Sequence, residues 1–467
     1  MSLRLLHYAD LERAADDPEL LGRLSGLVDS LRDDETLVLG AGDDTAPGVL
    51  SLVTSGKHAL DVFEALQPAA ETFGNHDFDH GIAATREVVA DSPMPWVCAN
   101  VFEAEGSDEL FASESGTVPW RVVEAGEYRV GLVGVTTPGT PDMNPNADAL
   151  DFRDPIPAAR DALAAVRERD VDHTVLLSHC GSEDDSLAEA LDVDVILGGH
   201  AHDERIARIE ETLVVRPGPN ASGLGEVVFE DRPRAYRHPL RDAPVDEAVV
   251  EALETRQRDA GLADVVDTLA DPLPVTKANS KRGESRAGNF VTDAYRWVAE
   301  TDIAVHSTGG LRAVDPLVGA VTAADLIGVC PFENDLVRLS ISGEQVRRTA
   351  ANLGLAQYDP DELDQRRFGH ASGLSLVWDD EAREPRDVRV GGEPVDDDAT
   401  YSLATSGYYV DSTHLFDAFG PADVTDRLGP QYEAIVEYAR VQGVEAEIEG
   451  RIERPKLDAV LVRGGAD

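Results

Sequence analysis

The sequence predicts an α/β protein with two domains, and three observations support this fold class. Short apolar runs alternate with amphipathic stretches along the first half of the chain, as expected for buried strands separated by helices. A second region with the same alternation follows an amphipathic segment at 243–263. The length of 467 residues agrees with two or three domains of about 100–200 residues each.

Six apolar runs of the first region are expected to be strands. They are 3–10, 35–44, 129–137, 173–181, 193–202 and 212–218, and they end in Gly, Asp, His or a turn. Residues 157–170 (PAARDALAAVRERD) and 186–192 (SLAEALD) have the spacing of helices. Ligands of open α/β sheets bind beyond the carboxyl ends of the strands, so the polar residues at these ends are the candidates for a site.

The domain boundaries are expected near the middle of the chain. We place the first domain at 1–240, a linker helix at 241–264 and the second domain at 265–467. The amphipathic segment APVDEAVVEALETRQRDAGLA carries no reactive motif, which suits a connector. The second domain is again α/β, with strand and helix patterns within 288–300, 302–312, 323–353 and 400–410.

The charge of the chain narrows the choice of partners. Acidic residues number 89 and basic residues 41, so the formal net charge is −48. This excess runs along the whole chain and repels nucleic acid and anionic membranes, so neither is expected as a partner. It suits a protein that stays hydrated in concentrated salt, where the Debye length falls to about 3 Å at 1 M. We therefore expect a halophilic source.

The sequence also bears on the cellular compartment. No segment has 18 uncharged apolar residues, so no membrane span is expected. The start MSLRLLHYAD lacks the apolar core and cleavage site of a secretory signal. Cys98, Cys180 and Cys330 are isolated, odd in number and not spaced like zinc ligands. These features predict reduced thiols in a cytoplasmic protein.

Five strand ends of the first region carry residues that bind metals or move protons. They are Asp10, Asp43, Asn75 with His76, His179, and His200 with His202. Any one of them alone is more often part of a turn than a ligand. Together they supply oxygen and nitrogen ligands for two divalent ions. Two ions about 3.5–4 Å apart can clamp a phosphoryl group and activate water, so the set points to phosphoester chemistry.

In their order along the chain, these motifs resemble those of the calcineurin-like metallophosphoesterases. That family carries D-x-H, G-D, G-N-H-[ED], a strand-end His and G-H-x-H. The whole chain resembles the 5′-nucleotidase branch, which includes UDP-sugar hydrolases and 2′,3′-cyclic nucleotide phosphodiesterases. The resemblance implies a four-layer α/β metal domain, a smaller substrate-binding domain and two divalent metal ions.

The resemblance also implies a role for each matching residue of the first domain. Asp43 is expected to bridge the two ions, with Asn75, His179 and His200 at one site and Asp10 and His202 at the other. His76 is expected to face the substrate as an acid or electrostatic stabiliser, and Asp79 to orient it.

The chain departs from the family where D-x-H becomes Asp10-Leu11-Glu12. Glu12 could replace the missing His as a ligand, and an oxygen ligand would shift the preference from zinc towards manganese or magnesium. The alternative is a weak or empty site in which Glu12 only begins a helix, where an early carboxylate suits the dipole. We favour ligation by Glu12, and the metal stays open among Mn, Mg and Zn.

In the second domain the resemblance implies that an arginine and two aromatic rings bind a nucleotide. The segment GGLR matches N-G-G-G-x-R and places Arg312 on the phosphate. PFEN matches P-F-G-N and makes Phe332 one stacking ring, and Tyr408 is the best match for the second. Arg282 or Arg286 could assist.

Two departures in the second domain concern the nucleoside more than the phosphate. The family Asn before G-G-x-R becomes Ser307, and the Asp expected to bind ribose becomes His414.

We expect a metal-dependent phosphohydrolase that releases phosphate from a nucleotide by in-line attack of water held between two metal ions. A 2′,3′-cyclic-nucleotide phosphodiesterase or UDP-sugar hydrolase is the alternative within this class. A degenerate nucleotide-binding protein with an incomplete metal site is the alternative of another class.

Overall fold

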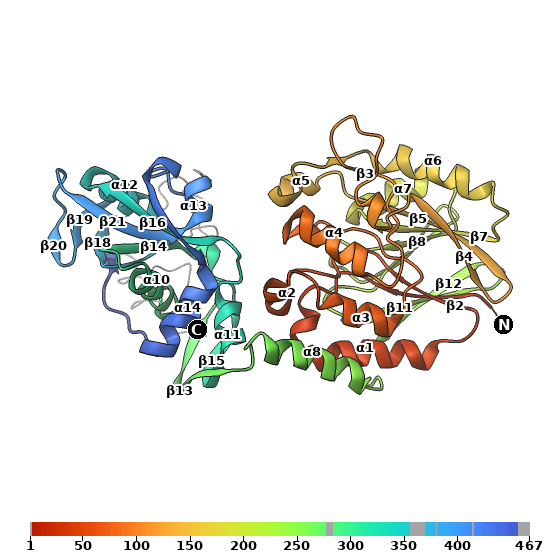
Figure 1. The fold of residues 1–467 in the computed structure, drawn as a ribbon, viewed down its shortest axis with the longest axis horizontal. Helices are drawn as coiled ribbons and strands as arrows, with labels where there is room; N and C mark the ends of the chain where they lie inside the picture. Colours follow the sequence, from red (N-terminus) through yellow and green to blue (C-terminus); the bar gives the residue numbers. More distant parts are fainter. Residues whose placement is uncertain (1, 277–283, 355–368, 380, 413–414, 456–467) are drawn as a thin grey trace. The chain divides into compact units, whose positions relative to one another are not determined.

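The computed structural model describes residues 2–276, 284–354, 369–379, 381–412 and 415–455. The chain divides into two compact units, 1–260 and 261–467, and both contain mixed α/β structure (Figure 1). The predicted fold class is therefore confirmed. None of the described helices combines the length and the apolar character needed to cross a membrane.

Two β-sheets form the centre of the first unit. The four-stranded sheet contains, in spatial order, β12 (Pro233–Pro239), β11 (Gly223–Phe229), β1 (Arg4–Tyr8) and β2 (Thr36–Gly40). The six-stranded sheet contains β4 (Trp120–Ala125), β5 (Tyr128–Thr136), β7 (His173–His179), β8 (Val195–Gly198), β10 (Thr212–Arg216) and β9 (Arg205–Ile209). Strands β1 and β2 are parallel, and so are β5, β7, β8 and β10. All six predicted strands are therefore present.

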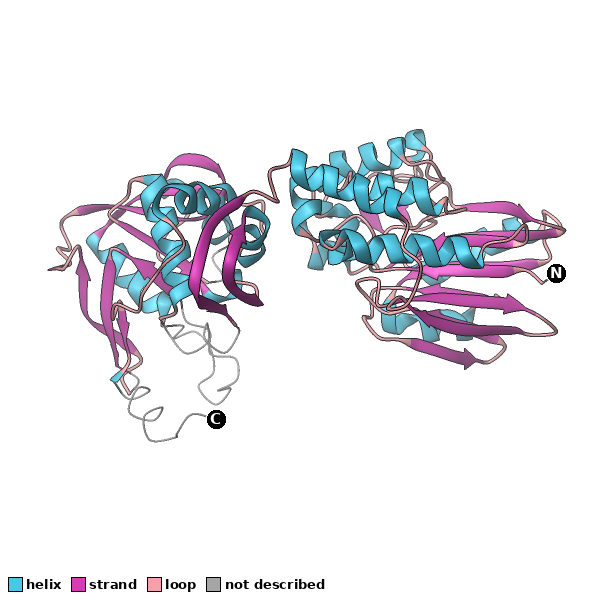
Figure 2. Ribbon diagram, turned by 90° about the horizontal axis from the view of Figure 1, so that it is seen from below, coloured by secondary structure: helices cyan, strands magenta, loops and turns pink. Residues whose placement is uncertain are grey.

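The two sheets share one apolar core and carry helices on their outer faces (Figure 2). Leu5 and Leu39 of the smaller sheet pack in the same cluster as Leu132 and Leu177 of the larger sheet. Successive side chains of a strand point to opposite faces, so Leu176 lies on the other face, in a cluster with residues of α6 and α7. The helices of this unit are α1 (Pro18–Leu31), α2 (Val49–Thr54), α3 (Ala59–Leu66), α4 (Gly81–Asp91), α5 (Thr140–Met143), α6 (Pro155–Arg167), α7 (Asp184–Ala190) and α8 (Glu247–Asp259). This is the four-layer arrangement that the family resemblance implied.

The helix predicted as a linker between the domains is α8, and its contacts lie in the first unit. It packs along α1 and α3. Arg256 of α8 forms a two-pronged ion pair with Asp61 of α3, with 2.9 Å between Nη2 and Oδ1. Gln257 Nε2 donates a hydrogen bond of 3.1 Å to the carbonyl of Asp16. The helix is therefore part of the first unit, and the chain passes to the second unit after it.

The second unit is built on a mixed five-stranded sheet. This sheet contains β17 (Gly369–Ser372), β14 (Ile303–Ser307), β21 (Thr400–Ser406), β16 (Asp335–Ser342) and β22 (Val424–Pro430) in spatial order. A four-stranded sheet contains β20 (Glu393–Pro394), β19 (Glu384–Val390), β18 (Leu374–Asp379) and β23 (Ile452–Glu453), and a ribbon pairs β13 (Val265–Val275) with β15 (Val314–Thr322). The helices are α10 (Arg286–Ala299), α11 (Ala323–Val329), α12 (Gly343–Leu353), α13 (Gly407–Asp411) and α14 (Gln431–Gln442).

Strand direction brings three predicted substrate-binding segments to one edge of the five-stranded sheet. Strand β14 runs parallel to β21, so Ser307 and Ser406 end at the same edge. Strand β16 is antiparallel to β21 and pairs Leu336 with Ser406, so it begins at that edge. The GGLR segment, Phe332 and Tyr408 therefore lie on loops at a common edge of the second unit.

Candidate metal centre

Most of the predicted metal ligands of the first unit lie at or just after the carboxyl ends of strands, whereas Asn75, also expected at a strand end, follows only isolated bridges at Ala70 and Glu71. Asp10 follows β1, Asp43 follows β2, His179 ends β7, and His200 follows β8. Asp10, Glu12, Asp43 and His200 have positive φ angles of 52°, 44°, 58° and 71°. Such conformations cost residues other than glycine about 1–3 kcal/mol each, so these four angles mark local backbone strain around the predicted ligands.

Two glycines allow the loops that carry Asp43 and Asn75 to touch. A Cβ on Gly74 would lie 2.2 Å from Asp43 Oδ1, and a Cβ on Gly42 would lie 2.5 Å from the nitrogen of Gly74. The buried carboxylate of Asp77 ties the loops together, since its Oδ2 accepts from the N–H groups of Asp43 (2.9 Å) and Gly74 (2.7 Å). The glycine that precedes the Asn-His pair is thus needed for close approach of two backbones.

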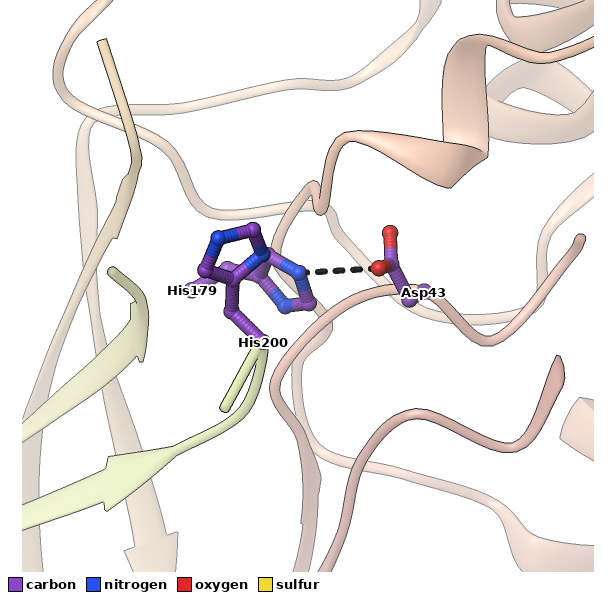
Figure 3. Close-up of side chains that lie close together, drawn as sticks. All are labelled: Asp43, His179 and His200. Atoms are coloured by element: carbon purple, nitrogen blue, oxygen red, sulfur yellow. Dashed lines mark ion pairs between the residues drawn. The ribbon is translucent and has the colours of Figure 1, made fainter. Parts of the chain in front are cut away.

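Asp43, His179 and His200 form the first group of potential ligands (Figure 3). One donor atom of each lies within 4.8 Å of those of the others. His179 Nε2 lies 3.0 Å from Asp43 Oδ2, and both side chains are buried. His179 Nδ1 donates a hydrogen bond of 2.7 Å to the carbonyl of Ala41, which directs Nε2 towards the group.

Asp10, Glu12 and His202 form the second group, also within 4.8 Å. His202 Nε2 lies 2.9 Å from Glu12 Oε1 and 3.9 Å from Asp10 Oδ1. Glu12 also begins a 3₁₀ helix, Glu12–Asp16, but its carboxylate faces His202. The structure thus places Glu12 where the missing His of the family pattern would be needed.

A third overlapping group joins the first two into one continuous centre. Glu12, Asp43 and His76 also have donor atoms within 4.8 Å of one another. Asn75 is buried beside them, and its Oδ1 has no hydrogen-bond partner among the described residues. The seven predicted ligands are therefore placed around one centre or, for Asn75, directly next to a member of it.

The charges of the centre fit divalent cations. Burial raises the pKa values of Asp10 and Glu12. The nearby histidines and hydrogen bonds therefore do not fully offset the cost of burying these two negative charges. Burial also opposes ionisation of Asp43, but His179 and His76 hold the pKa of Asp43 at about 2. Burial and the neighbouring His179 lower the pKa of His200 to about 4, which keeps this ring neutral, the form that binds metals. Excess carboxylate, neutral imidazole and an unpartnered amide oxygen are a suitable donor set for two such ions.

His76 and Asp79 form the predicted pair beside these ligands. His76 Nδ1 lies 3.0 Å from Asp79 Oδ2, and the two side chains are 38% and 28% exposed. Burial opposes protonation of His76, but the hydrogen bond to Asp79 and the charges of Asp43, Asp79 and Glu12 outweigh it and raise the pKa of His76 to about 9. Nδ1 is occupied by Asp79, so Nε2 is the nitrogen available to a substrate.

Two residues that anchor this region were not found from the sequence. Arg216 is buried at the end of β10, and its Nε lies 3.1 Å from Asp203 Oδ1, next to His202. Asn144, in a segment of turn-like composition, donates a hydrogen bond to Asp79. The arginine at the end of the apolar run TLVVRPG could have suggested the first, but no local motif marks either residue.

The second unit brings Arg312 and Phe332 together. The guanidinium carbon of Arg312 lies 4.6 Å from the centroid of the Phe332 ring, and Nη1 donates 3.0 Å to the carbonyl of Gly309. Tyr408 is 47% exposed and contacts Tyr409 edge-to-face, with 5.6 Å between ring centroids. One face of the Phe332 ring is thus covered by the arginine that was predicted to hold phosphate.

The other second-unit predictions have different outcomes. Arg286 donates from Nε to the carbonyl of Ala446 (2.6 Å) and from Nη1 to the carbonyl of Pro272 (3.1 Å). These two bonds link α10 to β13 and to the segment around Ala446, and the suggestion that Arg286 assists Arg312 stays a prediction. Ser307 Oγ lies 2.9 Å from the hydroxyl of Tyr409. Arg282 and His414 lie outside the described residues.

Comparison with known proteins agrees with this architecture. Residues 3–204 match the calcineurin-like phosphoesterase family, and residues 265–421 match the 5′-nucleotidase C-terminal domain. The fold and the metal centre thus define a calcineurin-like phosphoesterase. With its second unit, the chain belongs to the 5′-nucleotidase family of these proteins. Members of this family use two divalent metal ions.

Individual relatives are similar over most of this chain. The 5′-nucleotidase precursor from Thermus thermophilus is 26% identical, with a TM-score of 0.66 and coverage of 97% of this chain and 99% of that chain. The apyrase of Tabanus yao is 26% identical over 92% of this chain and 87% of its own length. The trifunctional nucleotide phosphoesterase protein YfkN of Bacillus subtilis (strain 168) is 23% identical over 96% of this chain, which spans only 35% of YfkN.

Proposed function

We propose that the protein is a metal-dependent phosphohydrolase that releases phosphate from a nucleotide, as a 5′-nucleotidase does. One observation carries this proposal: the continuous set of donors from Asp10 to His202 lies beside the His76–Asp79 pair. The relatives named 5′-nucleotidase and apyrase support nucleotide hydrolysis as the reaction class. A protein that only binds nucleotides would have no need for a histidine held by an aspartate next to its metal ligands.

Different residues of the chain would bind the metal ions, donate the proton and bind the substrate. When bound, two divalent ions would supply positive charge to the phosphoryl group and lower the pKa of a coordinated water. Asp79 occupies Nδ1 of His76, so Nε2 is the nitrogen that can donate a proton to the leaving oxygen or stabilise its charge. Asp79 holds the opposite nitrogen and fixes the ring. In the second unit, Arg312 presents donors for phosphate, and Phe332 and Tyr408 offer ring faces for a base.

The preferred substrate within this class is a separate question. A 2′,3′-cyclic nucleotide or a UDP-sugar is the alternative to a nucleoside monophosphate. The name of YfkN, a trifunctional nucleotide phosphoesterase, favours a test of several substrates. The stacking of Arg312 on Phe332 also indicates that the base site differs from one with two open aromatic faces.

The test is phosphate release from AMP, UMP, a 2′,3′-cyclic nucleotide and a UDP-sugar in multimolar KCl with Mn²⁺. The assay for the cyclic nucleotide and the UDP-sugar includes a phosphatase coupling step. The His76→Ala variant is expected to lose roughly 10²–10⁴-fold in kcat, the usual range for a lost general acid. His80→Ala is the matched control, because His80 lies four residues away and its Nε2 lies 2.8 Å from Ser51 Oγ. Absence of turnover by folded, metal-loaded protein would instead favour the degenerate nucleotide-binding protein.

We also propose that the protein acts in the cytoplasm of a halophile and has neither nucleic acid nor membrane as a partner. The three free and buried cysteines support a reducing compartment. The acidic net charge supports a halophilic source and the absence of nucleic acid and membrane partners. Fractionation of source cells with an antibody against the chain tests the compartment. Recovery in the membrane or extracellular fraction would contradict it.

A further inference from the structure

Asn144 lies far from the metal-binding motifs in the sequence but next to them in the structure. It sits between α5 and the 3₁₀ turn Pro145–Ala147 and is 6% exposed. Its sequence separation is 69 residues from Asn75 and 65 from Asp79. None of the motifs that identify the site includes this residue.

The side-chain amide of Asn144 uses its donors on the His76 turn. Nδ2 donates to the carbonyl of Asn75 (2.8 Å) and to Asp79 Oδ1 (2.9 Å), and Oδ1 accepts from the N–H of Asn146 (3.2 Å). Carbonyl and carboxylate oxygens only accept, and a backbone N–H only donates. The orientation of the amide is therefore set by its three partners.

These bonds hold both ends of the turn that carries His76. One end is the backbone of Asn75, and the other is the carboxylate of Asp79, which lies 3.0–3.2 Å from His76 Nδ1. The Asp79 side chain is partly exposed, so without a second donor its carboxylate could rotate towards water. A carboxylate fixed at one oxygen presents the other to the imidazole in a single direction.

We propose that Asn144 is a positioning residue for the His76–Asp79 pair. It fixes the Asp79 carboxylate so that His76 keeps Nδ1 hydrogen-bonded and Nε2 directed at the substrate. This inference rests on the proposed phosphohydrolase function for its kinetic consequence. It does not depend on that function for its structural consequence, the hydrogen bond at Nδ1.

A double-mutant cycle separates positioning from a general structural role. We compare kcat and KM of the wild type, Asn144→Ala, His76→Ala and the double variant. Asn144→Ala is expected to lower kcat by roughly 10–100-fold, the usual cost of losing an outer partner, with KM little changed. In the His76→Ala background the same substitution is expected to have no further effect, since residues that act through one another are not additive.

Asn146 provides the matched control. It is an exposed asparagine two residues away, and its Nδ2 donates 2.6 Å to the backbone carbonyl of Asp79, not to the carboxylate. Asn146→Ala is therefore expected to keep kcat within about threefold of the wild type. Metal content and the thermal unfolding midpoint of each variant check that the centre and the fold are intact. Asn144→Leu, which has a similar size but neither donor nor acceptor, replaces the alanine variant if that variant does not fold.

A spectroscopic measurement tests the inference even if no substrate is turned over. In protein with ¹⁵N-labelled histidine, the Nδ1 proton of His76, assigned by its loss in His76→Ala, is expected to exchange slowly in the wild type and rapidly in Asn144→Ala. Lack of any hydrolysis by the wild type would reject the proposed function and leave this readout to decide the role of Asn144. Unchanged exchange, or an undiminished loss of kcat in the His76→Ala background, would overturn the positioning role.

Discussion

Glu12 occupies the position where the family pattern has a histidine, and this exchange changes the chemistry of one half of the metal centre. Its group consists of two carboxylates and one imidazole, Asp10, Glu12 and His202, whereas the other group has two imidazoles and Asp43. Carboxylate ligands favour manganese and magnesium, and imidazole also suits zinc. We therefore expect the two halves of the centre to differ in metal preference.

Substitution of Glu12 tests this asymmetry. Glu12→Gln is expected to lower the Mn²⁺ content from two ions per chain towards one, and Glu12→His to increase retention of Zn²⁺ relative to Mn²⁺. Metal content after dialysis and titration calorimetry measure both, and an affinity loss of about tenfold or more is expected for a lost ligand. Glu19→Gln, which removes a carboxylate paired with Arg23 on the surface, is the control. If Glu12→Gln retains both ions as tightly as the wild type, Glu12 serves only to begin its helix.

Some residues of the site could be predicted from the sequence, and others could not. Asp43, Asn75 and His200 could be predicted because each belongs to a short motif, in which the local backbone sets the position. Asn144 could not, since its contacts bridge 65–69 residues and depend on how separate loops pack. The contact between Arg312 and Phe332 could not be predicted for the same reason, although the sequence indicates each residue as a candidate for substrate binding.

At the level of elements, strands β14 and β17 place two buried histidines opposite each other. His306 and His370 are paired in the register of these antiparallel strands. Burial lowers the pKa of His306 to about 4 and that of His370 to about 3, and the proximity of His306 and Arg451 adds to the effect on His370. Both rings are therefore neutral in the folded second unit.

This pair predicts acid sensitivity of the second unit. Unfolded histidine has a pKa of about 6.5, so the unfolded chain binds protons below that pH while the folded chain does not. The stability contributed by the neutral rings is present above pH 6.5 and is lost as the pH falls towards 4. The loss is on the order of 2 kcal/mol for each histidine at pH 5. Urea unfolding at pH 7 and pH 5 measures it, and His370→Gln is expected to show a smaller pH dependence; an equal dependence would contradict this account.

Burial explains most of the strands that could be predicted from the sequence. Predicted strands such as β1 and β8 have residues that are almost all buried, whereas the equally buried β11 (GLGEVVF), which contains two glycines and a glutamate, was missed. Edge strands β9 (RIARI) and β12 (PRAYRHP) alternate between partly buried and exposed residues and carry arginines, so no apolar run marks them. The linker helix was found by its pattern, but its packing on α1 and α3 is a tertiary property that periodicity does not contain.

At the scale of the whole molecule, the net charge of −48 predicts a strong dependence on salt. Self-repulsion of like charges destabilises the compact state, and the Debye length of about 10 Å at 0.1 M falls to about 3 Å at 1 M. The thermal unfolding midpoint is expected to rise by roughly 10 °C or more between 0.2 and 2 M KCl. Sucrose, which stabilises without screening charge, is the control and is expected to raise the midpoint less. A midpoint that is independent of KCl would rule out salt adaptation as the reason for the charge.

The positive φ angles at Asp10, Glu12, Asp43 and His200 have a consequence for how this protein can change. Glycine adopts this conformation without steric cost, so replacement by glycine would relieve backbone strain at each position. A laboratory selection for heat resistance alone would thus reward the loss of these side chains, and a selection for turnover would reject the same variants. Improvement of the two properties is opposed at these four positions, and engineered stabilisation has to come from elsewhere in the chain.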